Sequence, residues 1–168
     1  GGSNGYGTIF KITLAGNYSV LRQLNPATDG GAPQAALIQG TDSLLYGTTS
    51  NGGASNGGTI FKISTAGIFT VLRHLKYDTD GSNPEGNLVQ GTDGNFYGLT
   101  SVNAHFFKVS SNGTFTLLHT FISSSEGNTP LGGLILHTDG NFYATNSSAG
   151  LYGYGTIVKI TPAGTVTV

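Results

Sequence analysis

A hexapeptide that returns at nearly constant intervals restricts the possible folds of this chain more than any other feature. The sequence Gly-Thr-Ile-Phe-Lys-Ile occupies residues 7–12 and 58–63, and altered copies occupy residues 104–109 and 155–160. The lysines of successive copies are 51, 46 and 51 residues apart. Repeats of this length are supersecondary units that bury their apolar surface only against neighbouring copies. The chain is therefore expected to be a tandem array of similar units.

Each unit carries the signals of four short strands and none of a helix. The hexapeptide is followed by a glycine turn, an apolar segment such as residues 69–75, and a loop that contains proline. A hairpin follows, and in residues 88–100 its turn is Asp93-Gly94, a strong two-residue hairpin signal. Four antiparallel strands at this spacing predict an all-β fold built of β-propeller blades. A β-solenoid is the alternative, and the hairpins within each unit favour the propeller.

We expect one repeat domain over residues 1–168, with about three and a half blades. The longest connection is the loop that contains proline, and we place it between blades, so that each blade begins with its hairpin. On this assignment a half blade occupies residues 7–24. Full blades occupy about residues 35–75, 86–121 and 132–168.

Three and a half blades cannot close into a ring, because propellers have at least about four blades. We therefore expect either that the polypeptide extends beyond these residues or that another chain covers the open edges. Open strand edges with apolar neighbours invite pairing with another strand. The residues assigned to such assembly edges are Thr8, Phe10, Ile12, Val166 and Val168.

The composition excludes several classes of function. Only 9% of the residues are charged and the formal net charge is −1. Nucleic acids and anionic membranes bind basic surfaces, so neither is expected as a partner. No apolar run is long enough to cross a bilayer, so membrane insertion is not expected. The absence of cysteine excludes disulfides and thiolate chemistry. Low charge and an abundance of Gly, Ser, Thr and Asn favour an extracellular or cell-surface location.

The order of the motifs resembles a known tandem repeat. The hexapeptide, an Ala-Gly turn, a Val-Leu-Arg strand and Leu-Val-Gln-Gly-Thr-Asp-Gly-Asn-Phe-Tyr-Gly follow one another, and together they cover nearly the whole chain. This pattern resembles the choice-of-anchor type repeat of bacterial secreted and surface-anchored proteins. The resemblance implies a propeller-like fold, an extracellular location and no enzyme activity. The third copy departs most, because residues 102–105 replace the glycine-rich segment 51–58.

Two groups of residues are candidates for ligand contact. Asp78, Asp80 and Glu85 offer alternating oxygen ligands for calcium, although an ordinary turn is the favoured interpretation. Tyr152 and Tyr154 lie outside the repeat pattern and could stack on glycans. The histidines are scattered, so no metal site is predicted, and no cofactor is expected.

Aromatic and nucleophilic residues give no further site. Tyr46, Tyr97 and Tyr143 share one position of the repeat and are expected to pack blade on blade. No nucleophile motif is present, and the glycine-rich segments lack the features of a phosphate-binding loop.

These observations predict a non-enzymatic, extracellular structural or adhesive repeat protein. It would assemble through open blade edges into a fibre or a larger propeller, with identical chains or neighbouring repeats as partners. A glycan- or protein-binding propeller module is the alternative. A polysaccharide-active enzyme, such as a lyase or hydrolase, is a third interpretation.

Overall fold

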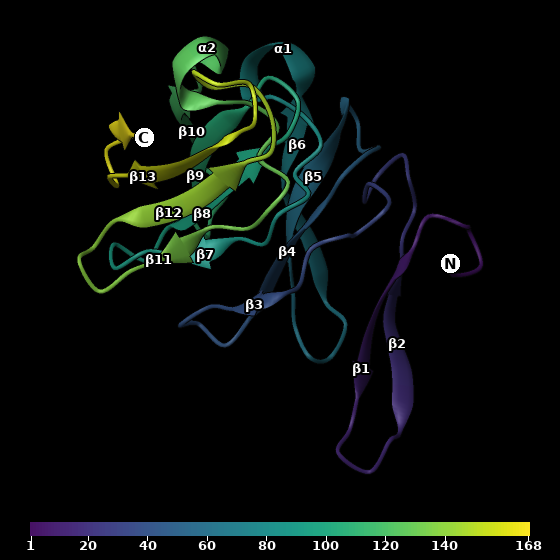
Figure 1. Cartoon of the computed structure of the whole chain (residues 1–168). Helices are drawn as coiled ribbons and strands as arrows, with labels where there is room; N and C mark the ends of the chain where they lie inside the picture. The colour runs from purple at the N-terminus through teal and green to yellow at the C-terminus, as the bar shows by residue number, and fades with distance from the viewer.

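The computed structural model describes residues 1–168 and consists of one two-stranded hairpin and three four-stranded sheets (Figure 1). The strands are β1 (Thr8–Ile12), β2 (Tyr18–Gln23), β3 (Ile38–Gln39), β4 (Leu45–Thr49), β5 (Asn56–Ile63), β6 (Phe69–Lys76), β7 (Val89–Gln90), β8 (Phe96–Thr100), β9 (His105–Val109), β10 (Phe115–Thr120), β11 (Ile135–Leu136), β12 (Phe142–Asn146), β13 (Thr156–Ile160) and β14 (Val166–Thr167).

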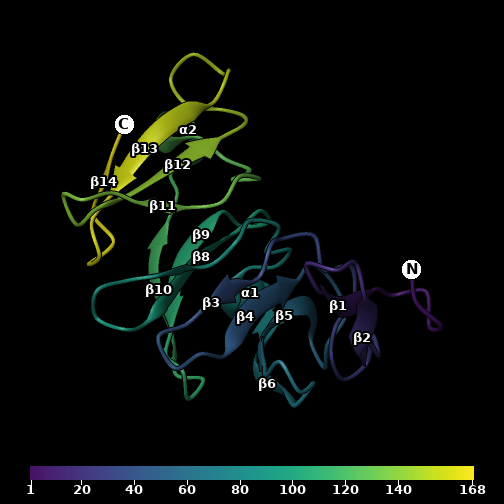
Figure 2. The same ribbon diagram turned by 90° about the horizontal axis from the view of Figure 1, so that it is seen from below.

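Every sheet is an antiparallel meander in chain order. The orders are β3-β4-β5-β6, β7-β8-β9-β10 and β11-β12-β13-β14, and β1 pairs with β2 alone. The three sheets follow one another through the molecule, with the β1–β2 hairpin beyond the first of them (Figure 2). The predicted all-β fold of propeller blades is confirmed. We call the β1–β2 hairpin the half blade, and the three sheets the first, second and third blades.

Two single-turn helices interrupt the expected all-strand pattern. They are α1 (Tyr77–Asp80) and α2 (Ser123–Glu126), and they lie at the same end of the molecule (Figure 1). Each ends in a carboxylate that accepts a hydrogen bond from a backbone N–H four residues earlier, which closes the turn. The N–O distances are 3.2 Å from Lys76 to Asp80 and 2.7 Å from Ile122 to Glu126. The prediction of no helix was wrong here, because these turns arise from a side-chain contact and not from apolar periodicity.

A one-residue bulge recurs in the fourth strand of the repeat. Leu21, Leu72 and Leu118 are the extra residues, each opposite an irregularity in the register with the preceding strand. The turn glycine of the next blade lies against the carbonyl oxygen of this leucine. At Gly164, with φ of 93°, a β-carbon would come within 2.5 Å of the oxygen of Leu118. The bulge is therefore a contact point for the turn of the following blade, and the turn position that meets it requires glycine.

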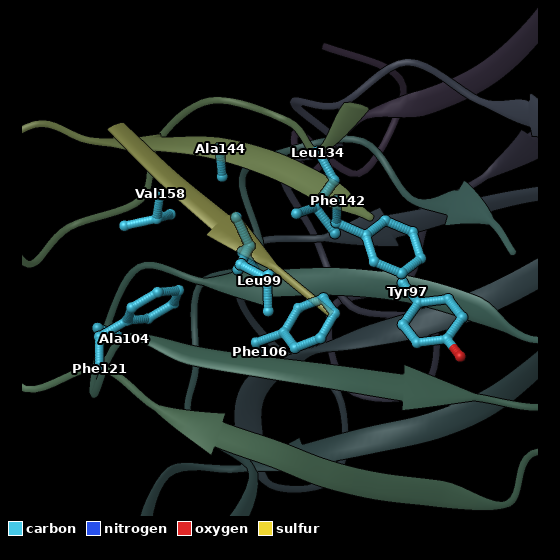
Figure 3. Packing of buried hydrophobic residues seen from close by; sticks show 10 residues of the cluster. Tyr97, Leu99, Ala104, Phe106, Phe121, Leu134, Phe142, Ala144 and Val158 are labelled. Atoms are coloured by element: carbon cyan, nitrogen blue, oxygen red, sulfur yellow. The ribbon is translucent and has the colours of Figure 1, made fainter. Parts of the chain in front are cut away.

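The hydrophobic core consists of three clusters, one at each junction between successive blades. At the first full junction the rings of Tyr46 and Phe96 stack with centroids 3.8 Å apart. At the next one the ring centroids of Tyr97 and Phe142 are 4.4 Å apart, and Figure 3 shows both rings among the apolar side chains of the two blades, with Phe106 beside them. Tyr46 and Tyr97 thus pack blade on blade, whereas Tyr143 of the last blade is only half-buried.

No helix of the chain has the length and apolar character needed to traverse a lipid bilayer.

Candidate functional site

Adjacent residues of the third strand point to opposite neighbours. We call the side of a blade that meets the following blade its forward face, and the side that meets the preceding one its rear face. Ile60 and Phe106 lie on forward faces, Phe61 and Phe107 lie on rear faces, and all four are fully buried. The repeat therefore has one standard junction, in which each forward face is complementary to the next rear face.

Polar contacts recur at the same junctions. The guanidinium groups of Arg22 and Arg73 lie over aromatic rings of the following blade, 5.1 Å from the centroid of Phe69 and 5.0 Å from that of Phe115. Such cation–π contacts contribute about 0.5–1 kcal/mol each at partly exposed sites. The side chain of Lys62 also donates to the carbonyl oxygen of Ser111 in the next blade, at 2.9 Å. Each blade is thus held to the next by apolar packing and by a small set of directed contacts.

The rear side of the half blade is an open end. Phe10 corresponds to Phe61 and Phe107, yet it is 53% exposed, and Ile12 is 64% exposed. Strand β1 has a partner only on the β2 side, whereas β5, β9 and β13 lie between two strands. A cavity of about 340 Å³ lies between β1 and the segment Ala35–Leu37 of the first blade. The predicted edge residues Thr8, Phe10 and Ile12 therefore lie on a strand whose second edge is unpaired and borders this cavity.

The forward face of the third blade is the second open end. Ile157 is 72% exposed, although it corresponds to the fully buried Ile60 and Phe106. Ile135 on the same blade is 67% exposed. Sequence reasoning missed both residues, because the identity of an isoleucine does not show whether a following blade covers its side chain. The signal was their alignment with core positions of the earlier repeats.

Tyr154 belongs to this second open end. Its repeat equivalents are Tyr6 and Gly57, whose carbonyl oxygens accept N–H bonds from Ala32 and Asn83 of the following inter-blade loops, at 2.8 and 3.1 Å. Tyr154 is 93% exposed and has no such loop beside it. Tyr152, at 82% exposure, has no counterpart in these loop contacts. Of the two predicted ligand-contact residues, only Tyr152 thus lies away from a junction position.

The other predicted edge residues, Val166 and Val168, lie at or just beyond β14. This strand is the outermost one of its sheet, as β6 and β10 are of theirs. Val166 packs against the cluster at the junction with the second blade, and Val168 is 65% exposed. Neither residue lies at the position of a missing neighbouring strand of the kind that β1 lacks.

The predicted calcium ligands do not converge. Asp80 is buried and accepts two hydrogen bonds from Arg73, at 2.8 and 2.9 Å. Asp78 is exposed and Glu85 is half-buried. No group of three or more His, Cys, Asp or Glu side chains has a geometry that could hold a metal ion. The structure assigns Asp80 to an ion pair that ties the outer strand to the inter-blade loop.

A contact at the same position is repeated in the other inter-blade connections. Arg22 donates to both carboxylate oxygens of Asp29 at 2.9 Å, and the Nε2 atom of His119 lies 2.8 Å from Glu126. Burial alone would raise the pKa of Asp29. Hydrogen bonds from Arg22, the backbone of Asn25 and Thr28 outweigh burial and lower that pKa below its usual value. A contact found in all three connections indicates a structural role.

A second recurring contact joins the hairpin turn to the buried tyrosine. The Tyr97 hydroxyl donates to Asp93 at 2.9 Å, and Tyr46 and Tyr143 donate to Asp42 and Asp139 in the same way. Burial and the hydrogen bond to Asp93 together raise the pKa of Tyr97 to about 12. The ionised form of this phenol is thus disfavoured in the folded chain.

This raised pKa predicts a loss of stability at alkaline pH. In the unfolded chain Tyr97 ionises near pH 10, so its contribution is complete below that pH and is lost as the pH rises towards about 12. We expect the loss to be about 2 kcal/mol over this range. Tyr97→Phe should cost about 1 kcal/mol at pH 8 and give a shallower decline between pH 10 and pH 12. Urea unfolding at a series of pH values measures both effects. Tyr18→Phe is the control, because Tyr18 is 58% exposed, and equal alkaline slopes in all three proteins would contradict the assignment.

Solved structures with the same architecture include enzymes. Virginiamycin B lyase from Staphylococcus aureus superposes with a TM-score of 0.71 at 19% identity, over 98% of this chain and 48% of that chain. A streptogramin B lyase gives a TM-score of 0.63 at 17% identity, with the same coverage of 98% and 48%. A protein described as a candidate gluconolactonase gives 0.56 at 14% identity, over 90% and 52%. The chain spans about half the length of these structures.

The prediction that the chain is not an enzyme is contradicted by these neighbours, two of which are lyases. The missing nucleophile motif was a weak argument, since propeller sites draw residues from loops of several blades and carry no local signature. At such low identity the likeness shows the propeller fold alone.

Sequence comparison identifies the repeat itself. No curated protein matches the sequence. The family profile of the Gloeobacter/Verrucomicrobia repeat matches residues 1–168, which is the entire chain. The half blade and the three blades are therefore copies of one recognised repeat, and the chain belongs to the Gloeobacter/Verrucomicrobia repeat family.

Proposed function

We propose that this chain is a section of a larger blade assembly on the outside of a bacterial cell. In this assembly, further repeats of the same kind cover both open ends and form a propeller or a fibre. The contrast between Ile157, 72% exposed, and its fully buried equivalents Ile60 and Phe106 carries the proposal. An apolar side chain of this size contributes about 1.5–3 kcal/mol when it is buried, so an uncovered junction face favours association.

Three further observations support the extracellular, assembling role. The forward face of the third blade and the rear face of the half blade are the two complementary sides of the standard junction, so a second copy can meet the first end to end. The low charge and the lack of cysteine suit a secreted repeat protein. The resemblance to choice-of-anchor repeats favours attachment to the cell surface.

End-to-end association should depend on Ile157. We expect the wild-type chain to associate with rising concentration, and Ile157→Asp to weaken association at least about tenfold, because a carboxylate would be buried at the junction. Light scattering coupled to size-exclusion chromatography measures the effect. Ile68→Asp is the matched control, because Ile68 is 73% exposed in the β5–β6 turn of the first blade, two blades away from Ile157. A wild-type chain that stays monomeric at about 1 mM, or equal effects of the two substitutions, would count against the proposal.

A further inference from the structure

We infer that the unpaired edge of β1 accepts the first two strands of another repeat of this family, and that the strand beside β1 carries a glycine opposite Phe10. This inference rests on the proposed completion of the open ends, and it specifies the chemistry of the occupant. The cavity of about 340 Å³ beside Thr8, Ile9 and Phe10 lies where such a strand would run.

The register of the complete blades shows why glycine is required. Gly47 lies opposite Phe61, and Gly98 lies opposite Phe107. A β-carbon on Gly98 would lie 2.5 Å from the Cζ atom of Phe107, and one on Gly47 would lie 2.8 Å from that of Phe61. Each phenylalanine ring thus extends across the backbone of the neighbouring strand and occupies the space of a side chain.

The third blade has the same pair with a smaller difference in size. Here Val158 stands in place of phenylalanine, and Ala144 stands opposite it in place of glycine. A smaller residue on one strand thus accompanies a larger one on the other, which indicates that the two positions are matched in size. The half blade has phenylalanine at this position, so its missing neighbour is expected to have glycine.

Lys11 adds a second requirement for the occupant. Lysine lies opposite the tyrosine of the second strand in every complete blade, and in the third one Lys159 lies 3.3 Å from Asp139, the carboxylate that Tyr143 also contacts. Lys11 donates to the carbonyl oxygen of Thr65, as Lys62 does to that of Ser111, but no tyrosine lies opposite it on the open side of β1. The occupant should therefore place a tyrosine opposite Lys11 and an aspartate four residues before it.

Thr8 completes the pattern. Its equivalent Thr59 lies opposite Thr49, and the two hydroxyl groups are 2.9 Å apart. The expected strand therefore reads Asp-x-x-x-Tyr-Gly-x-Thr, which is the pattern of residues 42–49 and 93–100. A hairpin of the same repeat therefore matches the open edge in side-chain size, in charge and in strand register.

The test is a graft on the full chain. A copy of residues 33–51 is placed directly before Gly1, because residues 1–7 then connect it to β1 with the same length as residues 52–58 in the first blade. We expect the graft to raise the Tm by roughly 5–10 °C and to slow amide exchange in β1. Gly47→Ala in the grafted copy alone should remove at least half of the rise. Adding Phe10→Val, which recreates the Ala144–Val158 pair, should restore it.

The outcomes separate the inference from the proposed function. If the graft raises the Tm equally with glycine or alanine at the tested position, the edge accepts a repeat hairpin but the size rule is wrong. If no graft changes the Tm or the exchange of β1, the edge does not accept this hairpin, and completion of the rear end by family repeats is overturned as well. The dependence of association on Ile157 is measured on the chain without a graft, so it tests the proposed function separately from the graft.

Discussion

Phe107→Ala is expected to lower the free energy of unfolding by about 3–5 kcal/mol, whereas Phe10→Ala should cost less than about 1 kcal/mol. The two phenylalanines occupy the same position of the repeat. Phe107 is fully buried in the junction between the first and second blades and packs on Phe115 with ring centroids 5.2 Å apart. Phe10 lacks a preceding blade and is 53% exposed. Urea unfolding followed by circular dichroism measures both values.

The paired design removes differences in residue type and strand position. Both substitutions delete the same atoms from the third strand, so the difference between them measures what the preceding blade and the adjacent second strand contribute together. Equal losses would mean that Phe10 is already covered in solution, through association or a rearranged half blade. Repeating the pair at several concentrations distinguishes these cases, since coverage by association depends on concentration.

Asp80→Asn should produce the second largest effect, a loss of about 2–3 kcal/mol. The carboxylate is 3% exposed and holds both donors of Arg73, whose side chain is 34% exposed. It also accepts a hydrogen bond from the hydroxyl of Thr79. An asparagine of equal size leaves Arg73 without its charged partner, while the exposure of Arg73 keeps the loss below that of a fully buried pair. Chemical unfolding at pH 7 gives the value.

Asp78→Asn is the matched control for this substitution. Asp78 lies two residues away in α1, is exposed, and should change stability by no more than about 0.5 kcal/mol. The same pair tests the calcium hypothesis. If Asp78, Asp80 and Glu85 bound calcium together, the wild-type Tm would rise with added calcium and both substitutions would abolish the rise. With Asp80 held by Arg73, we expect no rise in any of the three proteins.

Much of the fold could be predicted because the same strand and turn signals recur in several copies of the repeat. The hairpin turn at Asp93-Gly94 and the hexapeptide strands mark each blade locally. The single-turn helices could not be anticipated, because a four-residue turn has no periodicity and depends on where the side chains of Asp80 and Glu126 reach.

The open ends were only partly predictable, because exposure is a property of the neighbour and not of the residue. The unpaired edge at Phe10 was predicted because the first repeat has only its last two strands. Ile157 has the same character as Ile60, and only the arrangement of the blades shows that nothing covers it. The size match between glycine and phenylalanine became visible once the register paired Gly98 with Phe107.

The side-chain contacts of the inter-blade connections have a consequence for curvature. Asp29, Asp80 and Glu126 each join the end of an outer strand to the loop that begins the next blade, through contacts only seven residues apart in sequence. The rotation from one blade to the next is therefore constrained by a short, local contact, which forms whether or not the blades close into a ring. Because the contact recurs in every connection, it acts with the apolar packing between the blades to give each junction a similar rotation. A change at one of these contacts is therefore expected to alter the rotation at its own junction and to leave the other junctions unchanged.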